Sequence, residues 1–197
     1  GQNFLVNPSV CPRMAELGGA APGVGVLEIG PGVGVLTAEL ARRAGRVVCV
    51  ELDSRLPPIL AETLAEFDNV EIVLGDVMEV DLQSLIAERF GGMPVVVCAN
   101  LPYYITTPIL MRLLESRLPV DAITVMVQKE AAARLCAAPG ERECGAISAA
   151  IAYYAEPRVL FPVSACSFMP APKVDSAVIR LDLRPKPPVS PGDERLM

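Results

Sequence analysis

Short apolar segments rich in β-branched residues alternate with segments of helical character along most of this chain, and this order limits its possible folds. Apolar segments at 24–29, 46–50, 70–74, 94–99 and 122–127 are each followed by a helical stretch. Strands that alternate with helices form a parallel sheet covered on both faces. We therefore predict an α/β fold with a mostly parallel sheet. Two late segments, 158–161 and 176–183, have no helix between them and predict an antiparallel pair at one sheet edge.

A glycine-rich turn connects the first predicted strand with the first helix that follows it. Its sequence is Glu28-Ile-Gly-Pro-Gly-Val-Gly34. Glycine adopts left-handed conformations and lets the main chain approach a ligand closely. The spacing is GxGxG, which differs from the GxGxxG of dinucleotide-binding proteins. Such a turn can also be purely structural, so it indicates a ligand site only together with other residues.

Polar residues recur where the predicted early strands end. Gly30, Glu51, Asp76 and Asn100 are 21 to 25 residues apart, about one strand–helix unit each. The carboxyl ends of parallel strands line the ligand crevice of an open sheet, so these positions should face one cleft. Glu51 can accept both ribose hydroxyls of a nucleoside, and Asp76 can accept an adenine amino proton while the Val77 N–H donates to the ring. S-adenosylmethionine fits this pattern without a phosphate site, and NAD is the alternative.

The fourth predicted strand ends in Asn100-Leu101-Pro102-Tyr103. Asn100 Oδ1 and the Leu101 carbonyl can each accept one N–H of an exocyclic amine. The Tyr103 ring can cover the face of a planar substrate. A proline turn with an ordinary surface tyrosine is the alternative, and the upstream polar residues favour the binding site.

Composition excludes several kinds of site. The 197 residues include six cysteines, none in a CxxC pair, and no histidine, so we expect no metal site and no Ser-His or Cys-His hydrolase. Free thiols indicate a reducing cytoplasm. No apolar run reaches the roughly 18 residues that span a bilayer, and no signal segment is visible. The net charge of −6 argues against strong nucleic-acid binding, and we interpret Arg42, Arg43 and Arg46 as charges that complement a helix C-terminus.

Seven segments in a fixed order resemble the ribosomal RNA adenine-N6,N6 dimethyltransferases, specifically the small-subunit type. These segments are Gly1-Gln-Asn-Phe-Leu5, 28–37, 50–53, 75–77, 100–110, 127–130 and 168–176. The run Asn-Leu-Pro-Tyr-Tyr-Ile-Thr-Thr-Pro is more similar to the small-subunit enzymes than to the large-subunit resistance methylases, which tend to carry Asn-Ile-Pro-Tyr. The resemblance implies a Rossmann-like class I S-adenosylmethionine-dependent methyltransferase fold with a mostly parallel seven-stranded sheet.

The resemblance also implies a set of site residues. Those expected to contact S-adenosylmethionine are Gln2, Asn3, Leu5, Gly30, Gly32, Glu51, Leu52, Asp76, Val77 and Asn100. Those expected to hold the target adenine are Asn100, Leu101, Pro102 and Tyr103, with Phe168 on the other face of the base. The implied substrate is small-subunit ribosomal RNA within a pre-ribosomal subunit, dimethylated at adenine N6 by a cytoplasmic enzyme linked to ribosome biogenesis. We expect a monomer.

We expect residues 1–184 to form the catalytic domain and the proline-rich residues 185–197 to form a linker or tail. The resemblance implies a basic stretch before Gly1 and a helical C-terminal domain after Arg184 that would carry much of the RNA contact, and we expect a chain without them to bind the cofactor but not to methylate ribosomes. Three alternatives stay open. They are a cofactor-binding ribosome-assembly factor without turnover, another amino-group N-methyltransferase, against which Leu101 argues, and an NAD-dependent oxidoreductase.

Overall fold

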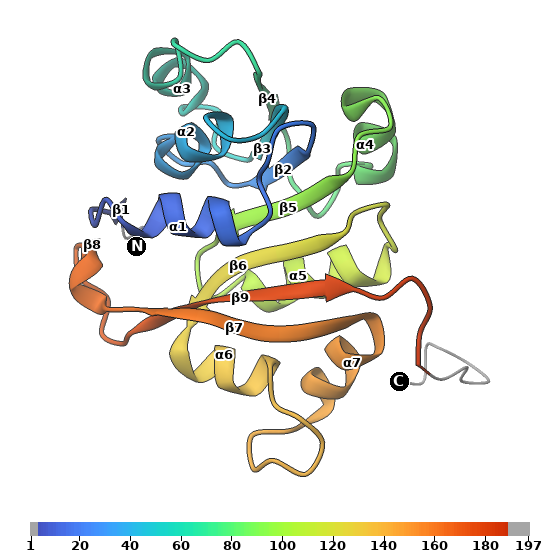
Figure 1. Ribbon diagram of the computed structural model, residues 1–197. Helices are drawn as coiled ribbons and strands as arrows, with labels where there is room; N and C mark the ends of the chain where they lie inside the picture. The colour runs from blue at the N-terminus through green and yellow to red at the C-terminus, as the bar shows by residue number, and fades with distance from the viewer. Residues whose placement is uncertain (1–3, 189–197) are drawn as a thin grey trace.

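One seven-stranded sheet forms the centre of the computed structural model, which describes residues 4–188. Its strands are β2 (Gly25–Ile29), β3 (Arg46–Glu51), β4 (Val70–Leu74), β5 (Val95–Asn100), β6 (Ala122–Gln128), β7 (Ala155–Val163) and β9 (Ser176–Leu183). Their order across the sheet is β4-β3-β2-β5-β6-β9-β7 (Figure 1). The first five run parallel, and β9 pairs antiparallel with both β6 and β7. The predicted parallel sheet and the antiparallel pair at one edge are both confirmed.

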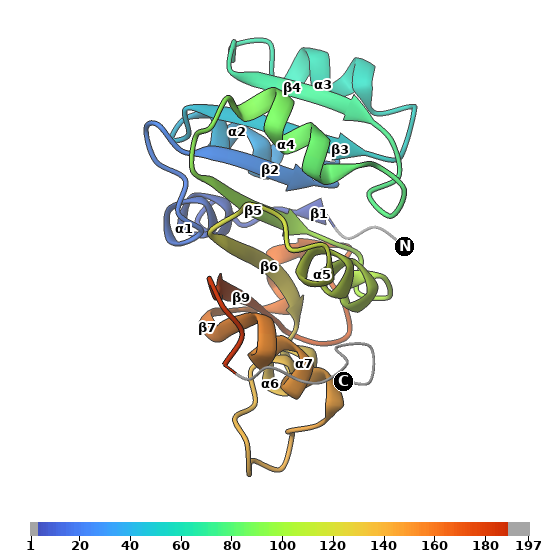
Figure 2. The same cartoon turned by 90° about the vertical axis from the view of Figure 1, so that its right-hand side faces the viewer.

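Helices cover both faces of this sheet, as predicted. They are α1 (Val10–Leu17), α2 (Val35–Ala41), α3 (Pro57–Thr63), α4 (Leu82–Phe90), α5 (Thr106–Glu115), α6 (Lys129–Leu135) and α7 (Ala146–Tyr154), with a 3-10 turn at Ala165–Ser167. Apolar residues of α4, α5, α6 and α7 pack on one face, whereas those of α1 and α2 pack on the other. Figure 2 shows α1 and α5 on opposite sides of the sheet. The central strands β2 and β5 are therefore buried on both faces, which explains their nearly continuous apolar sequence.

A second, very small sheet joins two segments that are far apart in the sequence. Strand β1 (Phe4–Leu5) pairs antiparallel with β8 (Phe168–Met169), and Leu5 lies opposite Phe168 (Figure 1). Strands of two residues have no periodicity, and the sequence did not predict this pair. It brings the start of the described chain to the end of the sheet where β2, β3 and β5 finish.

The arginines that follow α2 form ion pairs with neighbouring acids, which agrees with a structural role. Arg43 lies 2.6 Å from Glu39 one helical turn away, and Arg46 lies 2.7 Å from Glu71 on β4. The six cysteines, all of which lie within 4–188, are free thiols. Among these same residues, no helix is long and apolar enough to cross a membrane.

Candidate functional site

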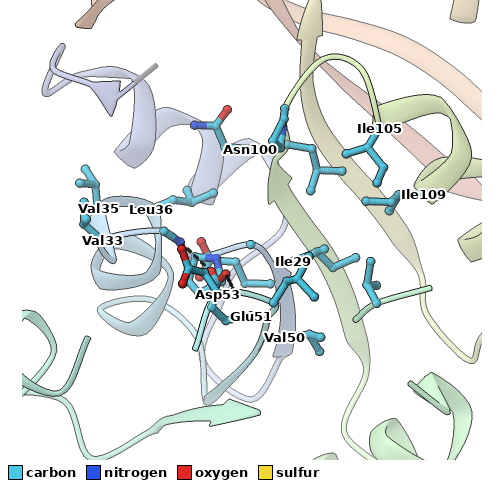
Figure 3. A pocket seen from close by; sticks show the side chains of 18 of the residues that line it. Ile29, Val33, Val35, Leu36, Val50, Glu51, Asp53, Asn100, Ile105 and Ile109 are labelled. Atoms are coloured by element: carbon cyan, nitrogen blue, oxygen red, sulfur yellow. Dashed lines mark hydrogen bonds between the residues drawn. The ribbon is translucent and has the colours of Figure 1, made fainter. Parts of the chain in front are cut away.

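A cavity of about 580 Å³ lies at the carboxyl ends of the parallel strands. Segments that follow β2, β3, β4 and β5 all contribute to its lining, and Leu5 and Phe168 of the small sheet complete it. This is the crevice position at which open parallel sheets bind ligands. In Figure 3, Val33, Val35 and Leu36 lie across the cavity from Ile105 and Ile109.

The glycine turn after β2 lets the main chain itself form part of the wall. Gly30, Gly32 and Gly34 have φ angles of +68°, +60° and +88°, which are left-handed values that other residues resist. A Cβ added at Gly32 would have no atom within 4 Å. The Gly34 N–H donates to the Pro31 carbonyl at 3.0 Å and closes the turn into α2. A ligand can therefore lie directly against the main chain of this turn.

Glu51 is the last residue of β3, and its carboxylate holds the glycine turn through a hydrogen bond. Its side chain is only 6% exposed. One carboxylate oxygen accepts the Gly32 N–H at 3.3 Å, and the other accepts the Asp53 N–H at 2.8 Å (Figure 3). Two main-chain bonds therefore orient an acidic acceptor at the cavity wall before any ligand binds. Leu52, the next residue, lines the cavity as well and is exposed.

Asp76 and Val77 form the wall that follows β4. The Gly75 N–H donates to the Glu51 carbonyl at 2.8 Å, which joins this wall to the end of β3. Asp76 Oδ1 accepts the Met78 N–H at 2.8 Å, while Val77 is buried against the core. The structure thus brings the two predicted acceptors, Glu51 and Asp76, and the predicted donor, the Val77 N–H, to the same cavity.

The segment after β5 forms the opposite wall. Asn100 is the last residue of β5, Leu101 is buried, and both line the cavity with Pro102 and Tyr103. The Pro102 carbonyl accepts the Ile105 N–H at 3.2 Å, so the segment turns directly into α5. The Asn100 side chain projects from the end of its strand in Figure 3.

Tyr103 and Phe168 share the cavity but differ in how they are held. The Tyr103 ring is half-buried, and its hydroxyl lies 2.7 Å from Ser176 Oγ on β9. Phe168 is only 5% exposed and packs in the core with residues of α1. Most of the Phe168 ring is therefore covered by protein, so the face that it offers to a ligand is small.

The described site residues predicted from the sequence all line one cavity. Gln2 and Asn3 lie outside the described residues. Sequence reasoning missed other lining residues, among them Ile105 and Ile109 at the start of α5, whose four-residue spacing places them on one helix face. It also missed Tyr104, which lines the cavity and is 84% exposed.

Glu28 is a further lining residue, and it is buried beneath the glycine turn with 1% exposure. The Cys49 thiol donates to Glu28 Oε2 at 3.4 Å. Burial raises the pKa of Glu28 to about 7, against the opposing effect of the neighbouring Thr37 hydroxyl and Cys49 thiol. Within residues 4–188, no three His, Cys, Asp or Glu side chains gather in a way that could hold a metal ion.

Solved structures with the same arrangement define the class of this protein. A dimethyladenosine transferase from Plasmodium falciparum matches with a TM-score of 0.79 at 27% identity, over 92% of this chain and 63% of that one. The 23S rRNA methyltransferase ErmE also gives a TM-score of 0.79, at 32% identity over 96% of this chain and 73% of that one. The protein has the class I S-adenosylmethionine-dependent methyltransferase fold.

Sequence comparison gives the family within this class. The family model for ribosomal RNA adenine dimethylase matches residues 1–195. Ribosomal RNA small subunit methyltransferase A of Geobacillus thermodenitrificans is 50% identical over 197 residues, which are 100% of this chain and 67% of the relative. The chain belongs to the ribosomal RNA adenine dimethylase family, and it spans about two-thirds of the length of that relative.

Proposed function

We propose that this protein transfers methyl groups from S-adenosylmethionine to the N6 amine of an adenine in small-subunit ribosomal RNA, twice per adenine. One observation carries the proposal. The Asn100–Tyr103 segment opens on the same cavity as the glycine turn, Glu51 and Asp76. A site for an amine and a site for an adenosine therefore share one cavity.

The cofactor side of the cavity fits S-adenosylmethionine. Gly30 and Gly32 leave the main chain accessible, and Glu51 presents a preoriented carboxylate to the ribose hydroxyls. Asp76 and Val77 would bind the adenine ring from the far end. When bound, the cofactor supplies an activated methyl group on its sulfonium. None of these groups requires a phosphate, which favours this cofactor over NAD.

The target side is built to hold an amine rather than to deprotonate it. Adenine N6 is a weak nucleophile because its lone pair is delocalised into the ring. Asn100 Oδ1 and the Leu101 carbonyl would accept hydrogen bonds from the two N6–H groups of an unmethylated adenine and favour a pyramidal nitrogen. These two hydrogen bonds strengthen as positive charge develops on the nitrogen, so they stabilise the transition state more than the bound substrate. Tyr103 would cover one face of the base, and the exposed edge of Phe168 would limit the other.

The target adenine must be unpaired or flipped out of a helix to reach this cavity. The sequence relative is named a small-subunit ribosomal RNA methyltransferase, which supports that substrate class. The chain has a net charge of −6, so the phosphate contacts that a ribosomal substrate requires would be few on this part of the protein. We also propose that residues 1–184 form the catalytic domain and that the protein is a monomer. The free thiols support a cytoplasmic location.

Two measurements test the proposal in sequence. Calorimetric titration with S-adenosylmethionine and, separately, with NAD tests the cofactor, and we expect heat from the first alone. Tritium transfer from methyl-labelled cofactor to small ribosomal subunits that lack the adenine methyl groups then tests the reaction, followed by nucleoside analysis for N6,N6-dimethyladenosine. Cofactor binding without any transfer, in a chain extended to the length of its relatives, would instead support an assembly factor without turnover.

A further inference from the structure

Asp76 organises the turn that follows β4 by accepting hydrogen bonds from main-chain N–H groups of the later residues of that turn. The Asp76 carbonyl accepts the N–H of Glu79 at 2.8 Å and the N–H of Val80 at 2.9 Å, and Asp76 Oδ1 accepts the Met78 N–H. The turn is also tight, since a Cβ added at Gly75 would lie 2.8 Å from Val80 Cγ2. These contacts satisfy donors of the turn, whereas its outward carbonyl groups need donors from another element.

Arg112 of α5 supplies those donors. Its Nε donates to the Val77 carbonyl at 3.0 Å, and its Nη2 donates to the Val80 carbonyl at 3.1 Å. The guanidinium is planar and presents its N–H groups in a fixed fork. Two bonds from one rigid group to carbonyls three residues apart fix both the position and the tilt of the turn. Because the donor is charged, each bond is stronger than a bond between neutral groups.

The helix that carries Arg112 also borders the amine side of the cavity. The Pro102 carbonyl accepts bonds from the Ile105 N–H and, at 3.1 Å, from the Thr106 hydroxyl. Ile109 lines the cavity one turn further on, and Arg112 follows three residues later. Helix α5 therefore contacts the amine-binding segment at its first turn and the Asp76–Val80 turn near its end.

We propose that Arg112 is a positioning residue, which holds the Asp76–Val80 turn in the orientation that lets Asp76 and Val77 face the cofactor adenine. The proposal rests on the function proposed above, which assigns that end of the cavity to the adenine. Loss of the fork leaves the glycine turn and Glu51 in place, but the Asp76–Val80 turn then occupies other positions for part of the time. The apparent affinity for the cofactor falls in proportion to the fraction of molecules in which the turn is in place.

The test uses the variants Arg112→Gln and Arg112→Lys, with Arg89→Gln as the matched control. Arg89 forms an exposed ion pair of 3.1 Å with Glu71 on β4, so the control removes an arginine near the same strand without touching the turn. We expect Arg112→Gln to weaken S-adenosylmethionine binding about tenfold by calorimetry, as if about a tenth of the molecules kept the turn in place. Arg112→Lys should bind S-adenosylmethionine more tightly than Arg112→Gln, because its ammonium can still donate to one of the two carbonyls. The control Arg89→Gln should bind like the parent protein.

A second comparison separates positioning from a general structural role. The KM for S-adenosylmethionine should rise in Arg112→Gln while kcat at saturating cofactor stays unchanged, because the amine side is intact. If Arg112→Gln lowers both kcat and the melting temperature, Arg112 only supports the fold. Equal losses of affinity for S-adenosylmethionine in Arg112→Gln and Arg89→Gln would also overturn the proposal.

Hydrogen exchange without any ligand gives a readout that does not depend on the proposed function. The amides of Met78, Glu79 and Val80 should exchange faster in Arg112→Gln, while those of β2 and β3 keep the parent rates. Unchanged exchange of these three amides would refute the role of Arg112 even if the parent protein binds the cofactor. Conversely, a parent protein that binds no S-adenosylmethionine refutes the proposed function, and the exchange result still decides whether Arg112 holds the turn.

Discussion

The Tyr103 hydroxyl lies 2.7 Å from Ser176 Oγ, which ties the amine-binding segment to the first residue of β9. Ser176 is completely buried, so its hydroxyl depends on this contact. The bond fixes the tyrosine ring at the cavity wall, where an unanchored ring would move freely between rotamers. The orientation of the proposed base-covering ring is therefore set before the substrate arrives.

This contact predicts an unequal pair of stability effects. Tyr103→Phe leaves the buried Ser176 hydroxyl without its partner and should lower the free energy of unfolding by about 1–2 kcal/mol. Ser176→Ala should cost less, because the Tyr103 hydroxyl can turn to water. The double variant should be less destabilised than Tyr103→Phe alone, since no unpaired group is left. Urea unfolding of the four proteins measures the cycle, and simple additivity would argue against the bond.

Asn100→Ala should reduce methyl transfer by at least about a hundredfold, the loss typical of removing one transition-state hydrogen-bonding group. Asn100 ends its strand and makes no part of the central core, so the melting temperature should stay close to that of the parent protein. Labelled methyl transfer at saturating cofactor measures the first effect, and circular dichroism measures the second. Transfer at the parent rate would exclude Asn100 as an acceptor for N6.

Glu51→Gln should weaken S-adenosylmethionine binding by roughly ten- to a hundredfold, because a charge-assisted bond to the ribose contributes about 1.5–3 kcal/mol. Glutamine keeps an acceptor but donates with its amide nitrogen, so it cannot serve both the ligand and the N–H groups of Gly32 and Asp53. Glu62→Gln on the exposed face of α3 is the control and should bind normally. Calorimetry measures the affinity of both variants for S-adenosylmethionine, and equal affinities would show that Glu51 does not bind the cofactor.

The buried Glu28 predicts a pH dependence of stability. Its pKa in the folded protein, about 7, lies above the ordinary carboxyl value of 4.5, so the folded state binds the proton more tightly than the unfolded state. This contribution to stability is complete below about pH 4.5 and is lost as the pH rises through 7. Glu28→Gln, which stays neutral, should therefore gain stability relative to the parent protein between pH 5 and pH 8, by at most about 3 kcal/mol.

Urea unfolding at both pH values measures this difference. Glu88→Gln, at an exposed position of α4, serves as the control and should show no such trend. A parent-minus-variant difference that does not change with pH would mean that Glu28 keeps its charge in the fold.

The strands of the central sheet were predictable because burial on both faces imposes a continuous apolar sequence, as in β5. The site was predictable for a related reason, since parallel strands end at one edge and their terminal residues must share it. Element ends were less certain. Helix α5 begins at Thr106, two residues before Pro108, because proline is tolerated within the first helical turn, where its missing N–H would have no helical partner.

Features that depend on distant contacts could not be found from local pattern. The β1–β8 pair has two residues per strand, too few for any periodicity. The sequence assigns no role to Arg112, and only the fold shows that it bonds two carbonyl groups of another segment. The limited exposure of Phe168 likewise follows from its place in the core on the α1 and α2 side of the sheet, which no local signal indicates.

Strand β9 follows every other strand of the central sheet in the sequence, yet it is inserted between β6 and β7. A growing polypeptide that has reached β7 still has unpaired edges on both β6 and β7, and these edges can only be joined after residues 176–183 have been synthesised. The same insertion supplies Ser176, the partner of Tyr103. The central sheet therefore reaches its final strand order, and Tyr103 gains its hydrogen-bond partner, only after the last of its strands has been synthesised.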